Sequence, residues 1–154
     1  MHLRQINTKD KVKVKSIYFD SINSIDRSIY SPEQKFAWSS QAWENPEFDK
    51  AIENGEGWVA ENNYDLKGFA IRYPKDKLSL LYCRNNSKRI GIGTLLINKI
   101  EEEAKKENLT YLKTEASLIS YKLLLKHNWE IIRKEKIIIK NTNFIRYKMI
   151  KNLT

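Results

Sequence analysis

The stretch KRIGIGTLL (residues 88–96) decides the fold of this chain. Its two glycines, Gly91 and Gly93, stand at the start of a run of apolar residues with helical spacing. Glycine lets another group approach the backbone closely, and the first turn of a helix exposes unpaired N–H groups at the positive end of its dipole. We therefore expect the loop to hold a phosphate group, with Lys88 and Arg89 adding positive charge. A tight turn and close helix packing would favour the same two glycines.

Two common nucleotide-binding motifs do not match this loop. The sequence contains no G-x-x-x-x-G-K-[ST], which the P-loop of nucleotide hydrolases requires. Dinucleotide-binding loops need another glycine three residues after Gly93, and position 96 is leucine. The parallel βαβ unit of a dinucleotide-binding fold is also not predicted before the loop. Nucleotide hydrolysis and hydride transfer are therefore not indicated.

Composition predicts one globular domain over residues 1–154. A chain of 154 residues, of which 41% are hydrophobic, can bury a core, and the sequence shows no linker and no repeat. The first residues, MHLRQINTKDKVKVK, lack the apolar run of a secretory signal, and no segment is apolar enough to span a membrane. We therefore expect a cytoplasmic protein without a membrane partner. One cysteine, Cys83, and two histidines far apart in the sequence predict no metal site.

The excess positive charge is confined to the second half of the chain. The formal net charge is +9. Residues 1–77 contain 12 Lys and Arg against 12 Asp and Glu, whereas residues 78–154 contain 16 against 7. This distribution is compatible with a soluble basic surface, or with a polyanionic ligand that faces the half containing KRIGIG. Nucleic acid is one such ligand.

The first half of the chain predicts a strand, two helices and an antiparallel meander. Residues 2–6 alternate like a strand, and residues 8–26 have mixed helical spacing. Residues 31–34 (SPEQ) match a helix N-cap, a proline at the first helical position and the glutamine of a capping box, and we expect this helix to end before Pro46. Short polar turns separate three further strands, which are 57–63, 67–73 and 77–83.

The second half predicts two helices, a strand between them and a closing hairpin. The first helix runs from about Gly91 to Glu107, and the second, over 117–128, has Ser117 as its cap. The remaining strands are 109–116, 129–140 and 143–151. The expected order is β, α, α, β, β, β, α, β, α, β, β. This order predicts an α/β (α+β) chain.

Three stretches of the chain resemble one superfamily. Residues 80–106, LLYCRNNSKRIGIGTLLINKIEEEAKK, are similar to the acetyl-CoA signature of the GNAT superfamily of N-acetyltransferases. The signature is Arg/Gln-x-x-Gly-x-Gly/Ala after a strand and at the start of a helix, and Lys88 takes its leading position. YSPEQKFAW (30–38) and LKTEASLISYKLLLKHNWE (112–130) resemble segments of one bacterial subgroup of small, single-domain members. The likeness spans nearly the whole chain.

The resemblance implies the GNAT fold and acetyl-CoA as cosubstrate. The fold has a mixed, mostly antiparallel sheet of about six or seven strands flanked by about four helices. In this superfamily the fourth strand carries a bulge and splays from the fifth, and the pantetheine arm lies in the gap. The residues implied to bind acetyl-CoA are Leu81, Tyr82, Cys83, Lys88, Arg89, Ile90, Gly91, Ile92, Gly93 and Thr94.

The resemblance also implies direct transfer of the acetyl group to an amine in a ternary complex. A carboxylate usually takes the proton of the amine, and Glu115 and Glu61, near strand ends, are the candidates. Solvated strand-end carboxylates would have the same place in the sequence. Many members reprotonate the leaving thiolate with a tyrosine, and that position falls on Leu124 here. Tyr121, one helical turn earlier, and Tyr82 are candidate replacements, and water is another proton source.

The acceptor is expected to bind the aromatic first half of the chain. Tyr30 and Trp38 are the candidate substrate-binding residues, and rings beside carboxylates suit a small cationic or aromatic amine. Such rings also pack helices onto sheets. We expect a small-molecule or peptide amine as the acceptor, and no nucleic acid except a tRNA that carries the amine. A monomer and a homodimer are both compatible with the sequence.

Three function classes follow from these observations. The first is an acetyl-CoA-dependent N-acetyltransferase, which we favour. The second is a basic nucleic-acid-binding protein, suggested by the net charge of +9, whose affinity would fall steeply with salt. The third is a CoA-binding regulatory domain without turnover, suggested by the missing tyrosine. Saturable acetyl-CoA binding and acceptor-dependent thiol release separate the three.

Overall fold

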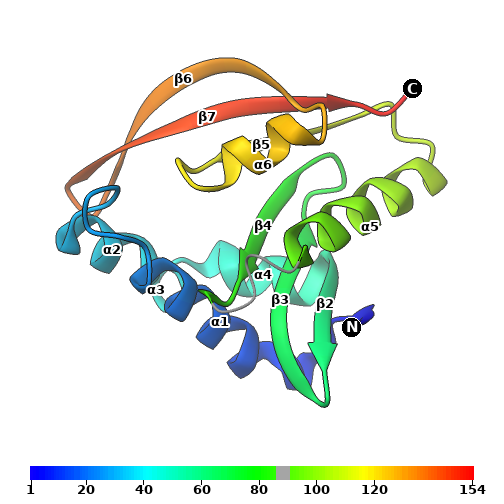
Figure 1. Cartoon of the computed structure of the whole chain (residues 1–154), viewed down its shortest axis with the longest axis horizontal. Coiled ribbons are helices and arrows are strands. Elements are labelled where there is room, and N and C mark those ends of the chain that lie inside the picture. Colours follow the sequence, from blue (N-terminus) through cyan, green and yellow to red (C-terminus); the bar gives the residue numbers. More distant parts are fainter. Residues whose placement is uncertain (86–90) are drawn as a thin grey trace.

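The computed structural model describes residues 1–85 and 91–154. Its strands in these ranges form two antiparallel sheets, which lie next to each other in Figure 1. The four-stranded sheet has the order β1-β2-β3-β4, and the three-stranded sheet has the order β5-β7-β6. The strands are β1 (His2–Gln5), β2 (Glu56–Asn62), β3 (Asp65–Arg72), β4 (Leu78–Cys83), β5 (Tyr111–Ala116), β6 (Glu130–Ile139) and β7 (Thr142–Asn152). They match the strands expected from the sequence.

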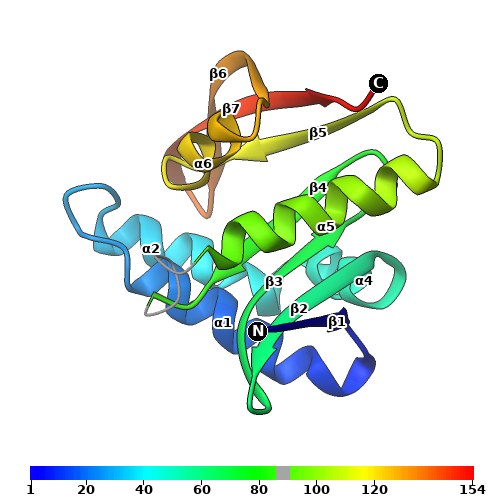
Figure 2. The ribbon, with the colours of Figure 1, turned by 45° about the vertical axis from the view of Figure 1, so that its right-hand side comes forward.

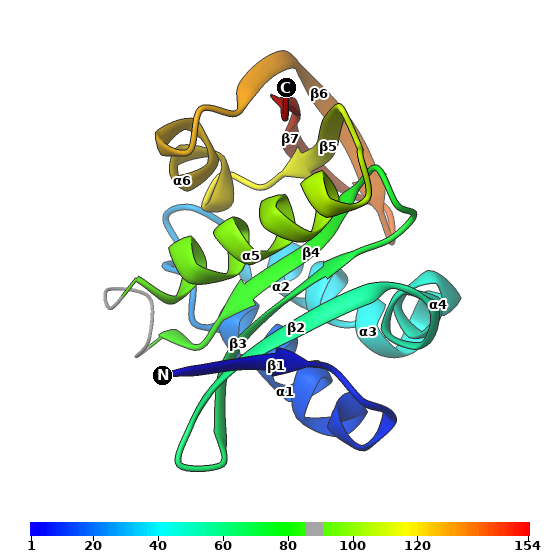
Figure 3. The same cartoon turned by 90° about the vertical axis from the view of Figure 1, so that its right-hand side faces the viewer.

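Helices cover both faces of the first sheet. Figure 3 shows α5 along one face, with α1, α3 and α4 on the other side of the strands. The helices of the described ranges are η1 (Thr8–Asp10), α1 (Lys11–Asn23), α2 (Pro32–Ser39), α3 (Gln41–Glu44), α4 (Pro46–Asn54), α5 (Ile92–Lys106) and α6 (Ser120–Lys126). None of these helices is both long and apolar enough to pass through a membrane.

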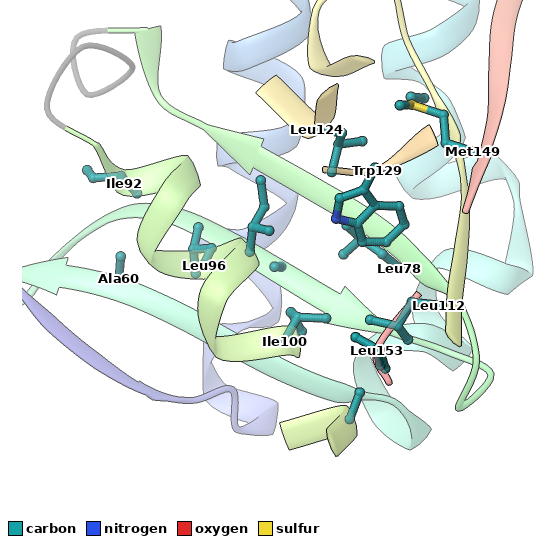
Figure 4. Close-up of a cluster of buried hydrophobic side chains, with 14 residues drawn as sticks. Ala60, Leu78, Ile92, Leu96, Ile100, Leu112, Leu124, Trp129, Met149 and Leu153 are labelled. Carbon is teal, nitrogen blue, oxygen red and sulfur yellow. The ribbon is translucent and has the colours of Figure 1, made fainter. Parts of the chain in front are cut away.

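Alternation along the strands divides the buried residues between two cores. Ala60 of β2 belongs to the core beneath α5, whereas its neighbour Val59 belongs to the core beneath α1 and α4. Figure 4 shows the first core, in which Ile92, Leu96 and Ile100 of α5 point toward the strands. Each of these isoleucine and leucine side chains is fully buried, which contributes about 1.5–3 kcal/mol apiece to folding. The predicted apolar face of this helix is therefore what fixes it to the sheet.

The two sheets are joined along only a short part of β4 and β5. Lys77 forms a parallel bridge with Lys113, whose N–H donates to the Asp76 carbonyl at 2.8 Å. Thr114 Oγ1 donates to the Leu78 carbonyl at 2.6 Å. Beyond these contacts the two strands diverge, as Figure 2 shows. The splayed pair of strands expected from the family resemblance is therefore confirmed.

An additional residue in β4 marks the point of divergence. Ile71 of β3 pairs with Leu80, and Arg72 pairs with Leu78, which leaves Ser79 as a β-bulge. The bulge changes which way the side chains face. Leu78 packs beneath α5, whereas Leu80, two residues later, packs in the core beneath α1. After the bulge, β4 therefore presents a different set of side chains to each side of the sheet.

The start of α2 follows the capping box expected from the sequence. Ser31 Oγ accepts a hydrogen bond from the Gln34 N–H at 3.1 Å, and Gln34 Oε1 accepts one from the Ser31 N–H at 2.9 Å. Gln34 also donates through Nε2 to the Asn143 carbonyl at 2.9 Å, near the start of β7. The cap therefore fixes α2 to the second sheet as well as fixing its own first turn.

The expectation of one helix ending before Pro46 was too simple. The helix α2 ends at Ser39, α3 follows, and α4 begins at Pro46 itself. Asn45 Oδ1 accepts a hydrogen bond from the Glu47 N–H at 3.0 Å, so Asn45 is the N-cap and Pro46 takes the first helical position. The proline therefore starts a helix here. It does not merely end the previous one.

Candidate functional site

A cleft opens where β4 and β5 diverge, and it consists of two hollows. The α5 hollow, of about 240 Å³, is lined by the start of α5, the end of β4 and residues in and after α1. The β5 hollow, of about 180 Å³, is lined by β4, β5, the β6–β7 hairpin and α2. The residues that line both hollows are Trp38, Leu81, Tyr82, Ser117 and Ser120. The two hollows therefore meet at the fork between the sheets.

The two loop glycines have different structural roles in the α5 hollow. Gly91 has a φ of 79°, in the left-handed region that favours glycine, and it is the N-cap residue of α5. A Cβ on Gly93 would lie 2.7 Å from Leu123 Cδ2, so a glycine there allows α6 to pack closely against α5. The glycines thus serve both the turn and the helix packing that the sequence indicates. Both also line the hollow.

The first turn of α5 presents backbone donors at this hollow. Within the described residues no side chain caps the helix, and its first intrahelical bond runs from the Leu95 N–H to the Gly91 carbonyl. The N–H groups of Ile92, Gly93 and Thr94 therefore have no partner within the helix. An anion placed there would be stabilised by these donors and by the helix dipole. Three other predicted loop residues lie outside the described residues, namely Lys88, Arg89 and Ile90.

The end of β4 forms another wall of the α5 hollow. Leu81, Tyr82 and Cys83 line it, as the resemblance implies for a pantetheine site. On one edge β4 pairs with β3. On the edge toward β5, the pairing found in the described part of the chain is the bridge at Lys77, just before the strand. The backbone of β4 after the bulge is thus open to an extended ligand, which would bind it as an added strand does.

Two tyrosines of the cleft retain their protons at neutral pH. Burial raises the pKa of Tyr82, and a hydrogen bond from the Trp38 side chain partly opposes that shift. Burial also raises the pKa of Tyr30, whose hydroxyl accepts the Leu118 N–H at 2.9 Å. The ring of Tyr30 packs 5.1 Å from that of Trp38 and 6.2 Å from that of Phe144, measured between centroids. The predicted substrate residues Tyr30 and Trp38 are therefore neighbours in the β5 hollow.

The two candidate glutamates lie in different places. Glu115 lines the β5 hollow, and its carboxylate forms an ion pair with Lys77 at 2.7 Å. Glu61 is on β2, where its carboxylate pairs with Arg4 of β1 at 3.1 Å, and it lines neither hollow. Of the two, only Glu115 is positioned to reach a molecule in the cleft.

The candidate tyrosine of α6 is also outside the cleft. The ring of Tyr121 packs against that of Tyr147, with 4.4 Å between centroids, and it lines neither hollow. Leu124, at the position of the usual family tyrosine, does line the β5 hollow and is 1% exposed. The helix thus presents a leucine where the resemblance leads one to expect a hydroxyl.

Several lining residues were not predicted as part of the site. Ser117 was expected only as a helix cap, and Ser120 was not singled out, although both line the two hollows. Phe144 and Arg146 of β7 line the β5 hollow, and Arg146 Nε pairs with Glu135 at 2.6 Å. Alternation in NFIRYKMIK places Phe144 and Arg146 on one face of a strand. It does not indicate that this face meets α2.

No metal site accompanies these residues in the described ranges. Over residues 1–85 and 91–154, no three His, Cys, Asp or Glu side chains lie in an arrangement that would hold a metal ion. The described residues that line the cleft offer backbone donors, hydroxyls, the guanidinium of Arg146 and the carboxylate of Glu115 beside Lys77.

Comparison with known proteins agrees with this geometry. The family model described as an acetyltransferase (GNAT) domain matches residues 27–151. No curated protein matches the sequence.

Solved structures of similar fold cover almost the whole chain. A GCN5-related N-acetyltransferase from Rhodopseudomonas palustris superposes with a TM-score of 0.92 at 23% identity, over 98% of this chain and 94% of that one. The PaiA N-acetyltransferase from Thermoplasma acidophilum, in complex with coenzyme A, gives 0.76 at 16% identity, over 98% of each chain. The protein yncA from Salmonella typhimurium, with its cofactor acetyl-CoA, gives 0.67 at 13% identity, over 100% and 94%. At these low sequence identities, the TM-scores show that the folds are alike and show nothing further.

Proposed function

The chain belongs to the GNAT family of acetyltransferases, and we propose that it moves the acetyl group of acetyl-CoA to an amine by direct attack in a ternary complex. Acetyl-CoA-dependent acetyl transfer is the activity of this family. The observation that carries the finer proposal is the fork between β4 and β5, where the two hollows meet. Two substrates that enter from opposite hollows would bring their reacting atoms together there.

Acetyl-CoA fits the α5 hollow by its chemistry. Its pyrophosphate is an anion, and the first turn of α5 offers the N–H groups of residues 92–94 and a glycine with positive φ. Its pantetheine arm carries amides, and the edge of β4 at residues 81–83 offers backbone partners for them. The basic second half of the chain favours a ligand with several phosphate charges.

Glu115 is the proposed general base. An ammonium group has to lose a proton before its nitrogen can attack, and Glu115 is the carboxylate that lines the β5 hollow. Lys77, 2.7 Å away, holds this carboxylate in place. The nitrogen then attacks the acetyl carbon, and a backbone N–H of β4 in the fork stabilises the oxyanion. We assign no catalytic role to Glu61, because Arg4 binds it outside both hollows.

The β5 hollow supports a small amine as the acceptor. At about 180 Å³ it is smaller than the roughly 300–1,000 Å³ usual for drug-sized ligands, and it suits a small molecule or one side chain of a peptide. The rings of Tyr30, Trp38 and Phe144 offer flat apolar contacts, and Glu115 offers a negative charge. A cationic amine would gain from both features.

The first test is calorimetric titration of the purified protein with acetyl-CoA. We expect one site per chain with a Kd of about 1 μM. Desulfo-CoA should bind with similar affinity, because the proposed contacts do not involve the sulfur. Thiol release should then appear with at least one member of a panel of small amines and amino-terminal peptides.

Each of the other two function classes predicts a different outcome of this test. Binding without thiol release across the whole panel would favour a CoA-binding regulatory domain. Absence of acetyl-CoA binding, combined with nucleic-acid binding that weakens steeply with salt, would favour a nucleic-acid-binding protein. Either result would refute the proposed transfer.

A further inference from the structure

Two serine hydroxyls lie where the α5 hollow and the β5 hollow meet. Ser117 and Ser120 line both hollows and belong to the segment that leads from β5 into α6. Ser120 precedes Leu124 by one helical turn, so the two residues lie on one side of the helix. The middle of the cleft thus contains hydroxyl groups although the usual tyrosine is missing.

The hydrogen bonds of Ser117 show where its own hydrogen goes. A serine hydroxyl has one donor and two acceptor positions. Ser117 Oγ accepts from the Ile119 N–H at 3.2 Å and from the Ser120 N–H at 3.0 Å, which fills both acceptor positions. Ser117 therefore donates in its contact with Ser120 Oγ at 3.2 Å. It has no acceptor position left for a hydrogen from Ser120.

The hydrogen of Ser120 is consequently available to a ligand. Ser120 Oγ accepts the Ser117 N–H at 3.1 Å, which holds the oxygen in place. Its other contact in the described residues is with Ser117 Oγ at 3.2 Å, where either oxygen could donate, and because both acceptor positions of Ser117 are filled, we infer that Ser117 donates there. Since Ser120 lines both hollows, its O–H is free to point into the fork.

We propose that Ser120 is a catalytic residue that donates a hydrogen bond to the sulfur of CoA as the thioester bond breaks. The inference rests on the proposed function, because it places the thioester where the two hollows meet. A hydrogen bond to a charged acceptor is stronger than one to a neutral acceptor, so this donor favours the thiolate over the thioester sulfur. It would therefore act mainly in the transition state.

The step balances without an additional reactant. The amine nitrogen bonds to the acetyl carbon, the carbon–sulfur bond breaks, and its electron pair goes to sulfur. Glu115 takes one proton from the ammonium before the attack and a second from the nitrogen after the new bond has formed, and it passes each of them to water. The thiolate takes a proton from water when it leaves. Ser120 keeps its own proton throughout, because an alcohol is a weaker acid than a thiol, and it stabilises the negative charge.

Neither tyrosine considered from the sequence fits this role as well. Tyr121 packs on Tyr147 outside both hollows. Tyr82 lines both hollows, but its ring packs against Tyr18 at 4.8 Å and Phe69 at 5.8 Å, in the core beneath α1. Its side chain therefore packs on the α1 side of β4, whereas Ser120 approaches the fork from α6.

The kinetic test compares three variants with the wild type. Ser120→Ala should lower kcat about 10- to 100-fold, the loss expected for one hydrogen bond to a charged group, with an unchanged Kd for acetyl-CoA. Ser120→Thr keeps a hydroxyl and should restore most of the rate. Ser40→Ala is the matched control, because its hydroxyl donates to the Ala37 carbonyl at 3.0 Å outside both hollows, and its rate should equal that of the wild type. Equal kcat in Ser120→Ala and the wild type would overturn the assignment.

A second readout needs neither an acceptor nor turnover. A donor to the thiolate lowers the pKa of the thiol of bound CoA, so this pKa should be about one unit higher in Ser120→Ala than in the wild type. Ultraviolet absorbance of the thiolate reports it, with the desulfo-CoA complex as the blank that cancels Cys83. If the wild type binds CoA without turnover and the thiol pKa still differs between the wild type and Ser120→Ala, the proposed transfer is refuted and the hydrogen bond from Ser120 to the sulfur is supported. Turnover without the shift would refute the Ser120 assignment alone.

Discussion

The α5 hollow offers a ligand the backbone groups of one contiguous stretch, whereas the β5 hollow offers mainly side chains. The first includes a helix N-terminus, a strand edge and two glycines from residues 81–94, beside side chains from α1, α2 and the segment that leads into α6. The second collects its side chains from four separate segments, and they include Tyr30, Trp38, Glu115, Phe144 and Arg146. A backbone site depends on a local pattern. A side-chain site depends on how distant segments pack, and any single substitution changes it.

This difference assigns separate tasks to the two sides of the cleft. Peptide groups are the same in every sequence, so a site made of backbone groups suits a ligand that is constant across a family. Acetyl-CoA is such a ligand for this family. Side chains determine shape and charge individually, which is why we propose that the β5 hollow selects the acceptor. Substitutions on one side should therefore alter one substrate and leave binding of the other intact.

The largest expected effect comes from placing a charge on the backbone side. Gly91→Glu should weaken acetyl-CoA binding by about 100-fold or more, because the new carboxylate repels the pyrophosphate at the helix N-terminus. Gly91→Asn is the matched control, since asparagine tolerates the positive φ of 79° and adds no charge. Calorimetry measures both affinities, and thermal unfolding shows whether each variant is folded. Equal affinity in Gly91→Glu and the wild type would remove the phosphate site from this loop.

A similarly large effect on rate, without an effect on acetyl-CoA, should come from the acceptor side. Glu115→Gln removes the proposed base and should lower kcat about 100-fold, within the range usual for general-base catalysis. Its Kd for acetyl-CoA should not change. Glu61→Gln, which breaks the pair with Arg4 outside the cleft, should retain the wild-type rate. The reverse pattern, with the loss in Glu61→Gln, would assign the base to the other glutamate.

A smaller effect is expected from removal of the Tyr30 hydroxyl, which supports the wall of the β5 hollow. Tyr30→Phe leaves the Leu118 N–H without its acceptor, which should cost about 1 kcal/mol of stability. The slight shift in the wall should raise the acceptor KM a few-fold, with acetyl-CoA affinity unchanged. Tyr64→Phe, at an 89% exposed tyrosine, should change neither quantity. Chemical denaturation and steady-state kinetics test the pair, and a loss of acetyl-CoA affinity in Tyr30→Phe would contradict the separation of the two sides.

The smallest effect on the cleft is expected from a buried carboxylate away from it. Asp10 accepts hydrogen bonds from Arg4 at 2.8 and 2.9 Å, and these bonds hold its pKa below the ordinary 3.8. The carboxylate thus stabilises the fold above pH 3.8, and this contribution is lost as the pH falls through its folded pKa. Asp10→Asn should lower stability near pH 7 by about 1–3 kcal/mol and leave both substrates unaffected.

The pH dependence provides the control for this last variant. The stability difference between the wild type and Asp10→Asn should shrink as the pH falls from 3.8 to the lower pKa of the folded protein, because the carboxyl is protonated first in the unfolded state and only at lower pH in the folded state. Asp65→Asn removes an exposed ion pair with Lys67 and should change stability much less. A difference that stays constant with pH would show that Asp10 does not act through its charge.

The fold could be predicted from the sequence where it depends on patterns of residues close together in the chain. The capping box at Ser31 and Gln34 and the apolar face of α5 each depend on residues within one or two turns, and both are as expected. The start of α4 was missed because proline ends one helix and also favours the first position of the next. The polar residue before it, Asn45, was the available signal.

The candidate site was predictable mainly where one contiguous stretch forms it, although the predicted side chains Tyr30, Trp38 and Glu115 also line the cleft. The loop glycines and the strand edge of β4 follow from one contiguous stretch, and Gly91, Gly93 and residues 81–83 do line one hollow. Ser120 was missed because its significance depends on which acceptor positions Ser117 has already filled. Arg146 was missed because the register of β6 and β7 alone does not show which face meets α2. Both depend on contacts between segments.

The bulge at Ser79 requires a residue at this position but does not require that it be a serine. The fork exists because β4 has an extra residue there, and Leu80 and Tyr82 face the α1 side because the alternation is offset after it. Other side chains at position 79 would preserve the offset, whereas deletion of the residue would turn every later side chain of β4 to the opposite face. Variation among relatives at this position should therefore take the form of substitution, and a gap in an alignment here would mark a protein with a different cleft.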